Sequence, residues 1–338
     1  MGSLGPTESG AAVSYFKIPL RLIPDNTNLP FMQWAKIRTP ISLVLIVISF
    51  VLFFTIGVNE GIDFKGGSSI EVHSVAGPAD MAKIRSIVDG LGLGDVQIQN
   101  IGNDNDVLIR VATQPGGEEA QQAVVTKVRG ALGGGAYDFR SVEVVGPRVS
   151  GELARTGTLA VLFTMAGIMI YIWFRFEWQF GIAAVATLVH DAILTVGFFA
   201  VTQIDFNLTS LAAILTIIGY SLNDTVVIFD RIREILRRYK QMPVRDIIDL
   251  ATNQTLARTI MTSLTLELAL VSLYFFGGPV VRSFTAAMIW GIFVATASSI
   301  FIGGPILVYF NIRPRPENKS KPAKSGADTA DTTTAAGA

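Results

Sequence analysis

Two charged residues stand out because each lies in or beside a long apolar segment. Asp224 belongs to the string GYSLNDTVVIFDRIRE at 219–234, about 22 Å beyond Thr209 if the segment is helical. A carboxylate at that depth in hydrocarbon costs several kcal/mol unless it is paired or hydrated, so it indicates a functional site by default. We therefore predict an ion or proton pathway at Asp224 that includes its neighbour Asn223.

The second charge, Arg258, lies on a polar stripe that follows one face of the next segment. The members recur at the spacing of a single helical face: Thr255, Arg258, Thr259, Thr262, Ser263, Leu266 and Glu267. A face of this kind cannot contact lipid and requires a partner helix or a hydrated path. The hydroxyl groups alone fit helix packing equally well, whereas Asp224 and Arg258 together favour function. Packing of the two segments would bring this pair within reach of a salt bridge.

Two other pairs of polar residues allow competing interpretations. His190 and Asp191 lie in the middle of an apolar run, where a buried hydrogen-bonded packing role and a proton relay are equally well supported. Asp230 lies further along the Asp224 segment and is followed by Arg231. For this pair we predict an interfacial ion pair at a helix end, with no part in the pathway.

The composition places these residues in a membrane protein. Of 338 residues 50% are hydrophobic and 16% charged, against about 25% charged in soluble domains. The 27 basic and 27 acidic residues cancel, so charge indicates no nucleic-acid partner. Cysteine is absent and histidine occurs twice, so the sequence predicts no metal site, and it contains no phosphate-binding GxxxxGK[ST] string. We expect no cofactor and no enzymatic activity.

Six apolar segments approach the roughly 20 residues needed to cross a bilayer. They fall at about 41–58, 158–174, 180–202, 208–229, 262–277 and 284–309. The first has no small-residue cleavage pattern after it, so we interpret it as a permanent span and not a signal sequence.

The distribution of lysine and arginine in the short loops predicts the orientation. Basic residues crowd the segments before span 1, between spans 4 and 5 and after span 6, whereas the opposite side offers only Arg282. We therefore predict a multi-pass membrane protein with both termini cytoplasmic and segment 59–150 outside; the resemblance described below implies that the membrane is the bacterial inner membrane.

Segment 59–150 has the pattern of a small folded domain. Runs that alternate apolar and polar residues at 69–75, 95–101, 106–112 and 137–145 predict strands. Helical patterns occupy 78–91 and 117–132. The resulting order, βαββαβ, is that of a ferredoxin-like α+β domain. The predicted fold is thus an α-helical membrane protein of six transmembrane helices with this domain between helices 1 and 2.

The remaining segments complete the predicted organisation. Residues 1–40 form a cytoplasmic N-terminal segment, and 41–58 the first transmembrane helix. Residues 151–312 hold transmembrane helices 2–6, with a basic cytoplasmic connector at 231–255 that reads as a helix on the membrane surface. A solvated connector that stops at Pro243 fits nearly as well. Residues 313–338 are too polar and small to bury a core and are predicted to be disordered.

Several strings, in their order along the chain, are similar to those of the SecF subunits of the bacterial SecDF protein-translocation machinery, relatives of the resistance-nodulation-division transporters. The strings are GIDFKGG at 61–67, VGP at 145–147, GEL at 151–153, HD at 190–191, GYSLNDTVVIFDRIRE at 219–234, NQTLARTIMTS at 253–263 and YFFGGPVVRSF at 274–284. The resemblance covers about 34–312, nearly everything outside the tails.

The resemblance implies a function and a set of partners. It implies pairing with a SecD subunit, and assistance by the proton motive force to the export of unfolded polypeptides through the SecYEG translocon with the SecA motor, with YajC as a further partner. It also implies that Asp224 and Arg258 belong to the proton path. The chain departs from the family pattern at Glu267, where relatives have a small or apolar residue. The nine residues from Arg258 to Glu267 span about 13.5 Å of helix, too far for a direct side-chain pair without a third group or water. Glu267 on this stripe either contributes, with Thr262, to proton or water access or simply reaches toward polar neighbours.

Two other functions fit parts of the pattern. A small-molecule or lipid exporter half-unit of the same superfamily is one, although such pumps usually carry both halves and larger external domains in one chain. A passive scaffold for translocon subunits is the other, and it would tolerate neutralisation of Asp224.

Overall fold

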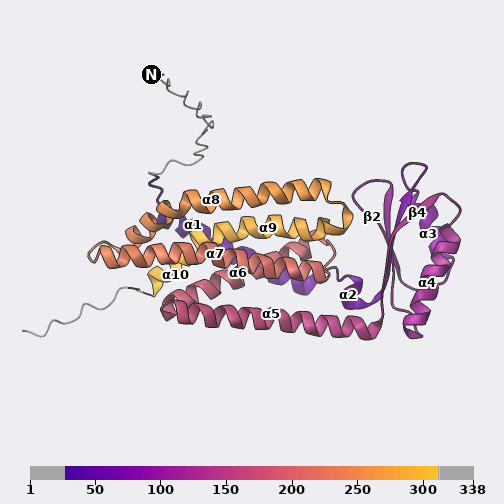
Figure 1. Cartoon of the computed structure of the whole chain (residues 1–338), viewed down its shortest axis with the longest axis horizontal. Coiled ribbons are helices and arrows are strands. Elements are labelled where there is room, and N and C mark those ends of the chain that lie inside the picture. The colour runs from indigo at the N-terminus through magenta and orange to yellow at the C-terminus, as the bar shows by residue number, and fades with distance from the viewer. Residues whose placement is uncertain (1–26, 311, 313–338) are drawn as a thin grey trace, which may run out of the picture.

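The computed structural model describes residues 27–310 and 312. The predictions for the first 26 residues and for the disordered tail at 313–338 lie outside this range. The described chain is elongated, with a bundle of long helices at one end and a four-stranded sheet at the other (Figure 1). Below, helices α1 and α5–α10 are called the bundle, and residues 67–145 the sheet domain.

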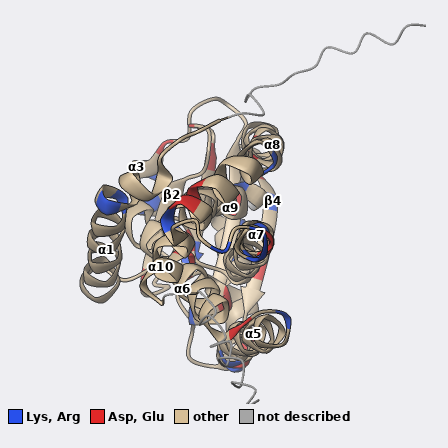
Figure 2. Ribbon diagram, turned by 90° about the vertical axis from the view of Figure 1, so that its left-hand side faces the viewer, with Lys and Arg blue, Asp and Glu red and all other residues tan. Residues whose placement is uncertain are grey.

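Within the described residues, six helices are long and apolar enough to cross a membrane, as predicted. They are α1 (Phe31–Thr55), α5 (Pro147–Arg175), α6 (Trp178–Thr202), α7 (Leu208–Arg238), α8 (Val244–Phe276) and α9 (Pro279–Phe301), the last continued by α10 (Gly303–Tyr309). Seen from the end far from the sheet domain, α1, α5 and α8 lie at the periphery around α6 and α9 (Figure 2). The apolar residues exposed on α1 and α5 face outward, where lipid surrounds the bundle.

The first helix corrects the predicted boundary at residue 41, because α1 begins at Phe31. Side chains of α8 bind the backbone at and just before its start: Asp249 accepts from Met32 N at 2.8 Å, and Asn253 accepts from Leu29 N at 2.9 Å. These bonds satisfy N–H groups that have no partner within a helix. Because Asp249 and Asn253 are far from α1 in sequence, the residues around Phe31 give no local signal of a helix start. The length of the apolar run alone therefore predicted a start that is too late.

The predicted helix over 231–255 is also wrong. Helix α7 continues to Arg238, a short turn follows, and α8 begins at Val244 with Pro243 as its N-terminal cap. Pro243 therefore opens a helix, because a fixed φ and a missing N–H are harmless at that end. The basic residues of this region belong to the ends of two spanning helices.

The sheet domain has the predicted βαββαβ order. Its elements are β1 (Gly67–Ser74), α3 (Met81–Asp89), β2 (Val96–Asn100), β3 (Asp106–Val111), α4 (Gly117–Leu132) and β4 (Tyr137–Val145). The strands pair antiparallel in the order β2-β3-β1-β4. Alternate strand residues such as Ile70 and Ile109 are fully buried in a core that includes Ile84 of α3 and Val128 of α4. A short helix, α2 (Ile62–Lys65), joins α1 to β1.

Small residues bring α9 close to α7 along a seam between the two helices. A Cβ atom added at Gly291 would collide with the Ile217 side chain of α7. Ser299, two turns further along, lies 3.0 Å (Oγ to Oγ1) from Thr225 of α7. The seam continues beyond α9 at Gly303, which packs on Phe229. The close approach of α7 and α9 therefore depends on residues without bulky side chains.

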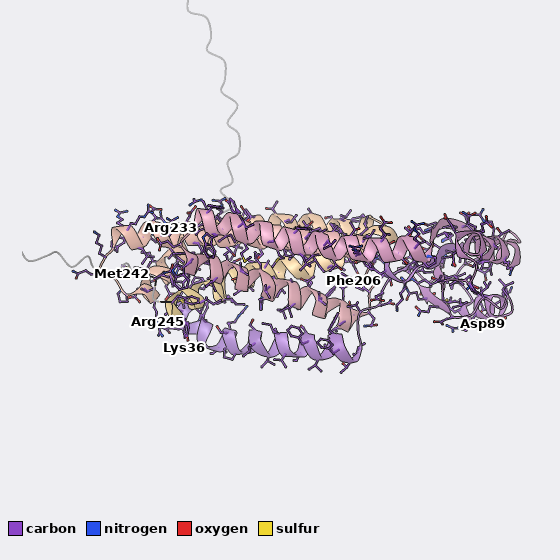
Figure 3. The ribbon with its side chains drawn as sticks, turned by 90° about the horizontal axis from the view of Figure 1, so that it is seen from below. Lys36, Asp89, Phe206, Arg233, Met242 and Arg245 are labelled. Atoms are coloured by element: carbon purple, nitrogen blue, oxygen red, sulfur yellow. The ribbon has the colours of Figure 1, made fainter. Side chains whose placement is uncertain are left out.

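Basic residues gather at the end of the bundle far from the sheet domain. Lys36, Arg233 and Arg245 lie there, opposite Asp89 of the sheet domain (Figure 3). The two loops of the bundle on the sheet-domain side, 203–207 and 277–278, contain no lysine or arginine. Lysine and arginine are thus concentrated at the end of the bundle that the loop charges predict to be cytoplasmic.

Candidate ion-transfer site

Asp224 is buried within the bundle on α7, the helix that packs against α6, α8 and α9. It is 4% exposed, and its Oδ2 has no hydrogen-bond partner among the described residues. Most buried polar groups in proteins do have partners, and one that lacks them bears the full cost of desolvation. A carboxyl group in this position is therefore easier to accommodate as the neutral acid than as the anion.

Arg258 lies on the outer surface of the bundle, on the neighbouring helix α8. It is exposed, and no ion pair joins it to Asp224 within the described part of the chain. The structure thus places the two charges on adjacent helices without the direct contact that packing was expected to allow.

The polar stripe on α8 divides into a buried and an open half. Thr255, Thr259 and Ser263 are buried against the bundle, whereas Arg258 and Thr262 are exposed. Glu267 and Leu266 are partly buried. The Oγ1 of Thr259 has no hydrogen-bond partner among the described residues, like the Oδ2 of Asp224 on the adjacent helix. One edge of the stripe is consequently buried against this chain, and the other faces outward.

Asn223 lies on the open side as well. Although it is adjacent to Asp224 in sequence, it is exposed while Asp224 is buried, because successive helical residues point about 100° apart. The exposed polar residues Asn223 and Arg258 therefore belong to two helices that contact each other, α7 and α8.

His190 and Asp191 form a second buried site, in which every hydrogen-bonding atom of the two side chains has a partner. His190 Nδ1 is 2.8 Å from Asp191 Oδ1, and its Nε2 is 2.6 Å from Ser42 Oγ of α1. Asp191 Oδ2 accepts from Ser221 of α7 at 2.5 Å and from Ser298 of α9 at 2.9 Å. The pair thus ties α6 to three other helices, which is a positioning arrangement.

Sequence reasoning did not single out Ser42, Ser221 and Ser298, which complete these contacts. It also missed Tyr220 and Thr296, which bond to Ser263 of the polar stripe in a second chain of hydroxyls with steps of 2.8 Å. Serine in an apolar helix is a weak signal by itself, because its hydroxyl can also bond to its own backbone. The available signal was spacing: Ser221 lies one turn before Asp224 on the same face of α7.

Asp230 and Arg231 do not form the predicted ion pair. Asp230 accepts two hydrogen bonds from Arg175, the last residue of α5. The distances from Arg175 Nη2 to Asp230 Oδ2 and Oδ1 are 2.8 and 3.0 Å. Arg231 instead contacts Glu234 and Gln254. Neighbours in a helix point in different directions, so the partner of Asp230 comes from another helix.

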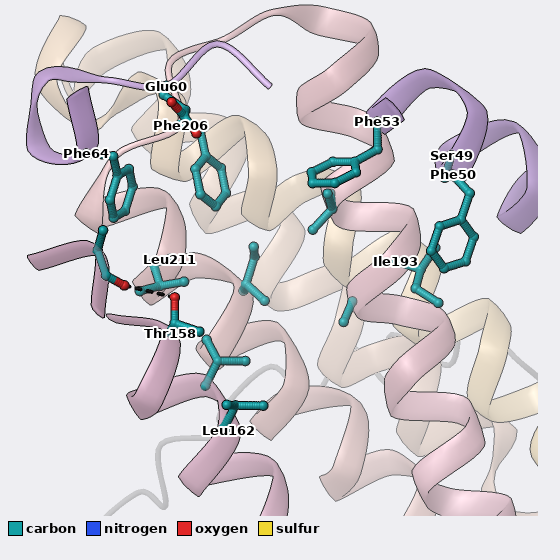
Figure 4. A pocket seen from close by; sticks show the side chains of 15 residues that line it. Ser49, Phe50, Phe53, Glu60, Phe64, Thr158, Leu162, Ile193, Phe206 and Leu211 are labelled. Carbon is teal, nitrogen blue, oxygen red and sulfur yellow. Dashed lines mark hydrogen bonds between the residues drawn. The ribbon is translucent and has the colours of Figure 1, made fainter. Parts of the chain in front are cut away.

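A large apolar cavity, separate from these charges, lies nearer the sheet domain. It has a volume of about 590 Å³, and its lining includes Phe50 and Phe53 of α1, Leu162 of α5 and Leu211 of α7 (Figure 4). Its few polar groups, among them Glu60 and Thr158, do not converge on one point. Within the described residues no group of three or more His, Asp or Glu side chains is placed to hold a metal ion.

Comparison with known proteins identifies the family. The model of the C-terminal part of the protein export membrane proteins SecD and SecF matches residues 125–313, and that of the SecD/SecF GG motif matches residues 51–74. The chain belongs to the SecD/SecF family. The matched regions contain Asp224, Arg258 and the GIDFKGG string, so the predicted resemblance is confirmed.

Relatives with assigned names show which branch of the family this is. The protein translocase subunit SecF of Rickettsia rickettsii is 44% identical over 86% of this chain and 95% of its own length. The SecF of Cereibacter sphaeroides is 43% identical over 89% of this chain and 96% of its own. The SecDF of Brucella abortus is 46% identical over 88% of this chain, which spans 39% of that longer protein.

Solved structures agree with the fold. The crystal structure of SecDF from Thermus thermophilus, a translocon-associated membrane protein, matches with a TM-score of 0.76 and 30% identity, over 86% of this chain and 39% of that one. SecDF in its super-membrane-facing form matches with a TM-score of 0.62 and 29% identity, over 85% and 39%. The chain is therefore a SecF-type multi-pass membrane protein that corresponds to one part of the longer SecDF chains. Relatives named as translocase subunits indicate a role in transport.

Proposed function

We propose that the chain is the SecF half of an export assembly of the bacterial inner membrane that uses an ion gradient to assist protein secretion. Its second half is a SecD-like subunit, and the assembly works with the SecYEG translocon and the SecA motor on unfolded exported polypeptides, with YajC as an associated subunit. The coupling ion is H⁺, taken up by Asp224. The chain itself catalyses no covalent chemistry.

The observation that supports this proposal is the unpartnered carboxyl oxygen of Asp224 in the middle of an apolar bundle. Protonation removes a charge that burial disfavours, and ionisation restores the attraction of the Arg258 field. The two states therefore differ in how they interact with α8. A difference of this kind is what a conformational equilibrium needs in order to respond to an ion.

The energy available from one proton is of the right size. A charge moved through about 150–200 mV is worth about 3.5–4.6 kcal/mol. A shift of a two-state equilibrium from 1:99 to 99:1 takes about 5.5 kcal/mol. One site at Asp224 thus supplies most of the energy for a movement between two states of the bundle.

The open side of the stripe supports a requirement for a second subunit. Arg258 and Asn223 are exposed on spanning helices of this chain, where lipid contact would leave their polar groups without partners. A homologous subunit packed on α7 and α8 would cover them. Purification in mild detergent is expected to recover this subunit, and a stable, fully active monomer would contradict the requirement.

The proposed orientation has both termini in the cytoplasm and the sheet domain outside. Because the chain contains no cysteine, single cysteines report on accessibility without background. In intact cells an impermeant thiol reagent is expected to label Ser86→Cys, on the exposed side of α3, and to spare Ser320→Cys. The reverse pattern would show that the orientation is wrong.

The functional test compares two aspartates of α7 in sealed vesicles with and without a proton gradient. Asp224→Asn retains shape and hydrogen bonding but cannot titrate, so it should abolish gradient stimulation of translocation while insertion and partner binding remain. Asp230→Asn, which only weakens the pair with Arg175, should retain stimulation. Normal stimulation in Asp224→Asn with loss in Asp230→Asn would show that the wrong aspartate was chosen. Replacing the proton gradient with a sodium gradient shows whether H⁺ or Na⁺ is the coupling ion.

Arg258 is tested by two substitutions of different severity. Arg258→Lys retains the charge but loses the planar guanidinium, so a partial loss of stimulation is expected. Arg258→Met removes the charge, and stimulation should be almost completely lost. Equal activity of the two variants would mean that the charge of Arg258 plays no part.

A further inference from the structure

The loop between α6 and α7 (residues 203–207) is bound to the segment that leads from α1 to the sheet domain. Phe206 N donates to Asn59 O at 2.8 Å, and Gly61 N donates to Phe206 O at 2.8 Å. Asn59 Nδ2 also donates to Asp205 Oδ1 at 3.0 Å. Because backbone and side-chain bonds both hold it, this loop moves together with the connecting segment.

The same segment binds the first turn of α7. Asp63 of α2 accepts a hydrogen bond at 2.9 Å from Leu208 N, at the start of α7. The first N–H groups of a helix have no partners within it, and the helix dipole favours a negative charge there. The next residue, Phe64, stacks on Phe206 with ring centroids 5.6 Å apart (Figure 4). A residue of the GIDFKGG string therefore anchors the helix that carries Asp224.

Two glycines join this anchor closely to the sheet. Gly66 and Gly67 have φ values of 74° and 122°, a region that favours glycine. A Cβ atom at Gly67 would run into the carbonyl oxygen of Val111 on β3, and one at Gly66 would meet Thr113. Asp63 is thus separated from the first strand by a short, tightly packed turn, and displacement of the sheet displaces the anchor.

An ion pair makes a second, independent connection. Arg110 on β3 pairs with Asp205 in the α6–α7 loop. The two side chains are only 11% and 21% exposed, so solvent screens their attraction weakly. Burial also lowers the pKa of Arg110. Breaking such a pair by removing one partner is costly, because the remaining charge stays in a poorly hydrated place.

Helix α7 links these connections to the ion site. It is continuous from Leu208 to Arg238, and Asp224 lies about 24 Å along it from Leu208. A single helix transmits displacement along its axis without a hinge. The contacts of Asp63 and Asp205 therefore lie at the end of the element that carries the proposed ion-binding carboxyl group.

We propose that Asp63, Arg110 and Asp205 are positioning residues that transmit movement of α7 to the sheet domain. This inference rests on the proposed function, since it assigns the route by which ion transfer at Asp224 reaches the part of the molecule outside the bundle. When α7 shifts, the ion pair and the helix anchor carry the sheet domain with it. If they are broken, ion transfer continues but the sheet domain no longer follows.

The experiment measures ion flux and gradient-stimulated translocation in the same vesicles, which contain the full assembly. In Arg110→Gln and Asp205→Asn we expect ion flux to remain near that of the parent. We expect stimulation to fall about fivefold or more, the lower end of the range typical of coupling between sites. The charge swap Arg110→Asp with Asp205→Arg should recover part of the stimulation. Arg175→Gln, which breaks the ion pair near the opposite end of α7, is the matched control and should leave both quantities unchanged.

A distance measurement reports on the sheet domain directly. Spin labels at Ser86→Cys on α3 and Ser272→Cys on α8 are exposed positions in a cysteine-free chain. The distance distribution is expected to broaden when Asp205→Asn is added, and to remain narrow with Arg175→Gln. An unchanged distribution in Asp205→Asn would overturn the proposed coupling.

Ion flux and gradient-stimulated translocation, measured together, distinguish a failure of the proposed coupling from a failure of the proposed function. Flux and stimulation that fall in proportion would overturn the coupling, because the residues would then act on the ion site or on folding. Stimulation that stays at the level of the parent would overturn it as well. A parent assembly without any gradient stimulation would instead overturn the proposed function, and the label distances alone would then decide the coupling.

Discussion

The bundle contains two buried aspartates that differ in how their oxygens are satisfied. Asp191 is fully buried, and both of its carboxyl oxygens have partners, supplied by His190, Ser221 and Ser298. Asp224 is almost as buried, yet its Oδ2 has no partner among the described residues. The two lie on adjacent helices and are linked by the face of α7 that carries Ser221 one turn before Asp224.

The difference indicates two different roles. A fully satisfied polar network fixes one arrangement of helices, because any shift breaks several bonds at once. A partly satisfied carboxyl group stabilises no single arrangement and gains from binding a proton. This comparison favours the packing role of His190 and Asp191 over the relay role, two roles that the sequence supported equally, and it supports the proposal that Asp224 takes up the ion.

Removal of Asp191 should have the largest effect on stability. Asp191→Ala leaves His190, Ser221 and Ser298 buried without their partner, so the free energy of unfolding should fall by about 3–5 kcal/mol. Thermal unfolding in detergent measures this change, with Asp224→Asn as the matched control that should remain close to the parent. If Asp224→Asn proved the more destabilising of the two, the assignment of roles would be reversed.

Loss of a single partner of Asp191 should have a smaller effect. Ser221→Ala removes one charge-assisted hydrogen bond, and a decrease of about 1.5–3 kcal/mol in the free energy of unfolding is expected. Ser298→Ala should behave similarly, whereas Thr216→Ala, on the exposed side of α7, should change little. Urea or thermal unfolding of the three variants side by side makes the comparison, and equal stability of all three would show that the network contributes nothing.

Glu71 is a third buried carboxyl group, outside the bundle, and extends the comparison to a site where pH acts directly. Burial raises its pKa above the ordinary 4.5, with Asp106 and Glu143 adding to the rise and Arg140 opposing it. The folded state therefore holds the proton more tightly than the unfolded state.

The protonated Glu71 side chain contributes stability below about pH 4.5. This contribution should be lost as the pH rises through the raised pKa that Glu71 has in the folded state. Protection of the β1 amides from hydrogen exchange, taken relative to the intrinsic exchange rate at each pH, is expected to fall over this interval in the full chain. Glu71→Gln should remove this dependence and increase protection at neutral pH. Lower protection at the acid end of the interval, in the parent alone, would contradict the sign of the shift.

The smallest effect is expected for Glu267, the acid that departs from the family pattern. It is about 13.5 Å along the helix from Arg258 and only partly buried. Glu267→Leu should therefore leave gradient-stimulated translocation within about twofold of the parent, or under about 0.5 kcal/mol. A loss as large as that of Asp224→Asn, at equal protein levels, would place Glu267 among the ion-binding groups.

Much of the architecture follows from local patterns in the sequence. The six spans depend on apolar length, and the βαββαβ order depends on alternation and helical periodicity, each of which is complete within ten to twenty-five residues. Asp224 was found because a charge in such a run is costly wherever the helix packs.

The tertiary structure decided which of these groups have partners. Asp191 and Ser298 are 107 residues apart in sequence, and the start of α1 is bound by Asp249 and Asn253 more than two hundred residues away. The same holds for Asp230 with Arg175 and for Asp205 with Arg110. A hydrogen bond or an ion pair depends on the position of two side chains in space, and helical periodicity fixes only the face on which each one lies. Whether a buried carboxyl group is satisfied is therefore a property of the packed bundle, and it is this property that separates Asp224 from Asp191.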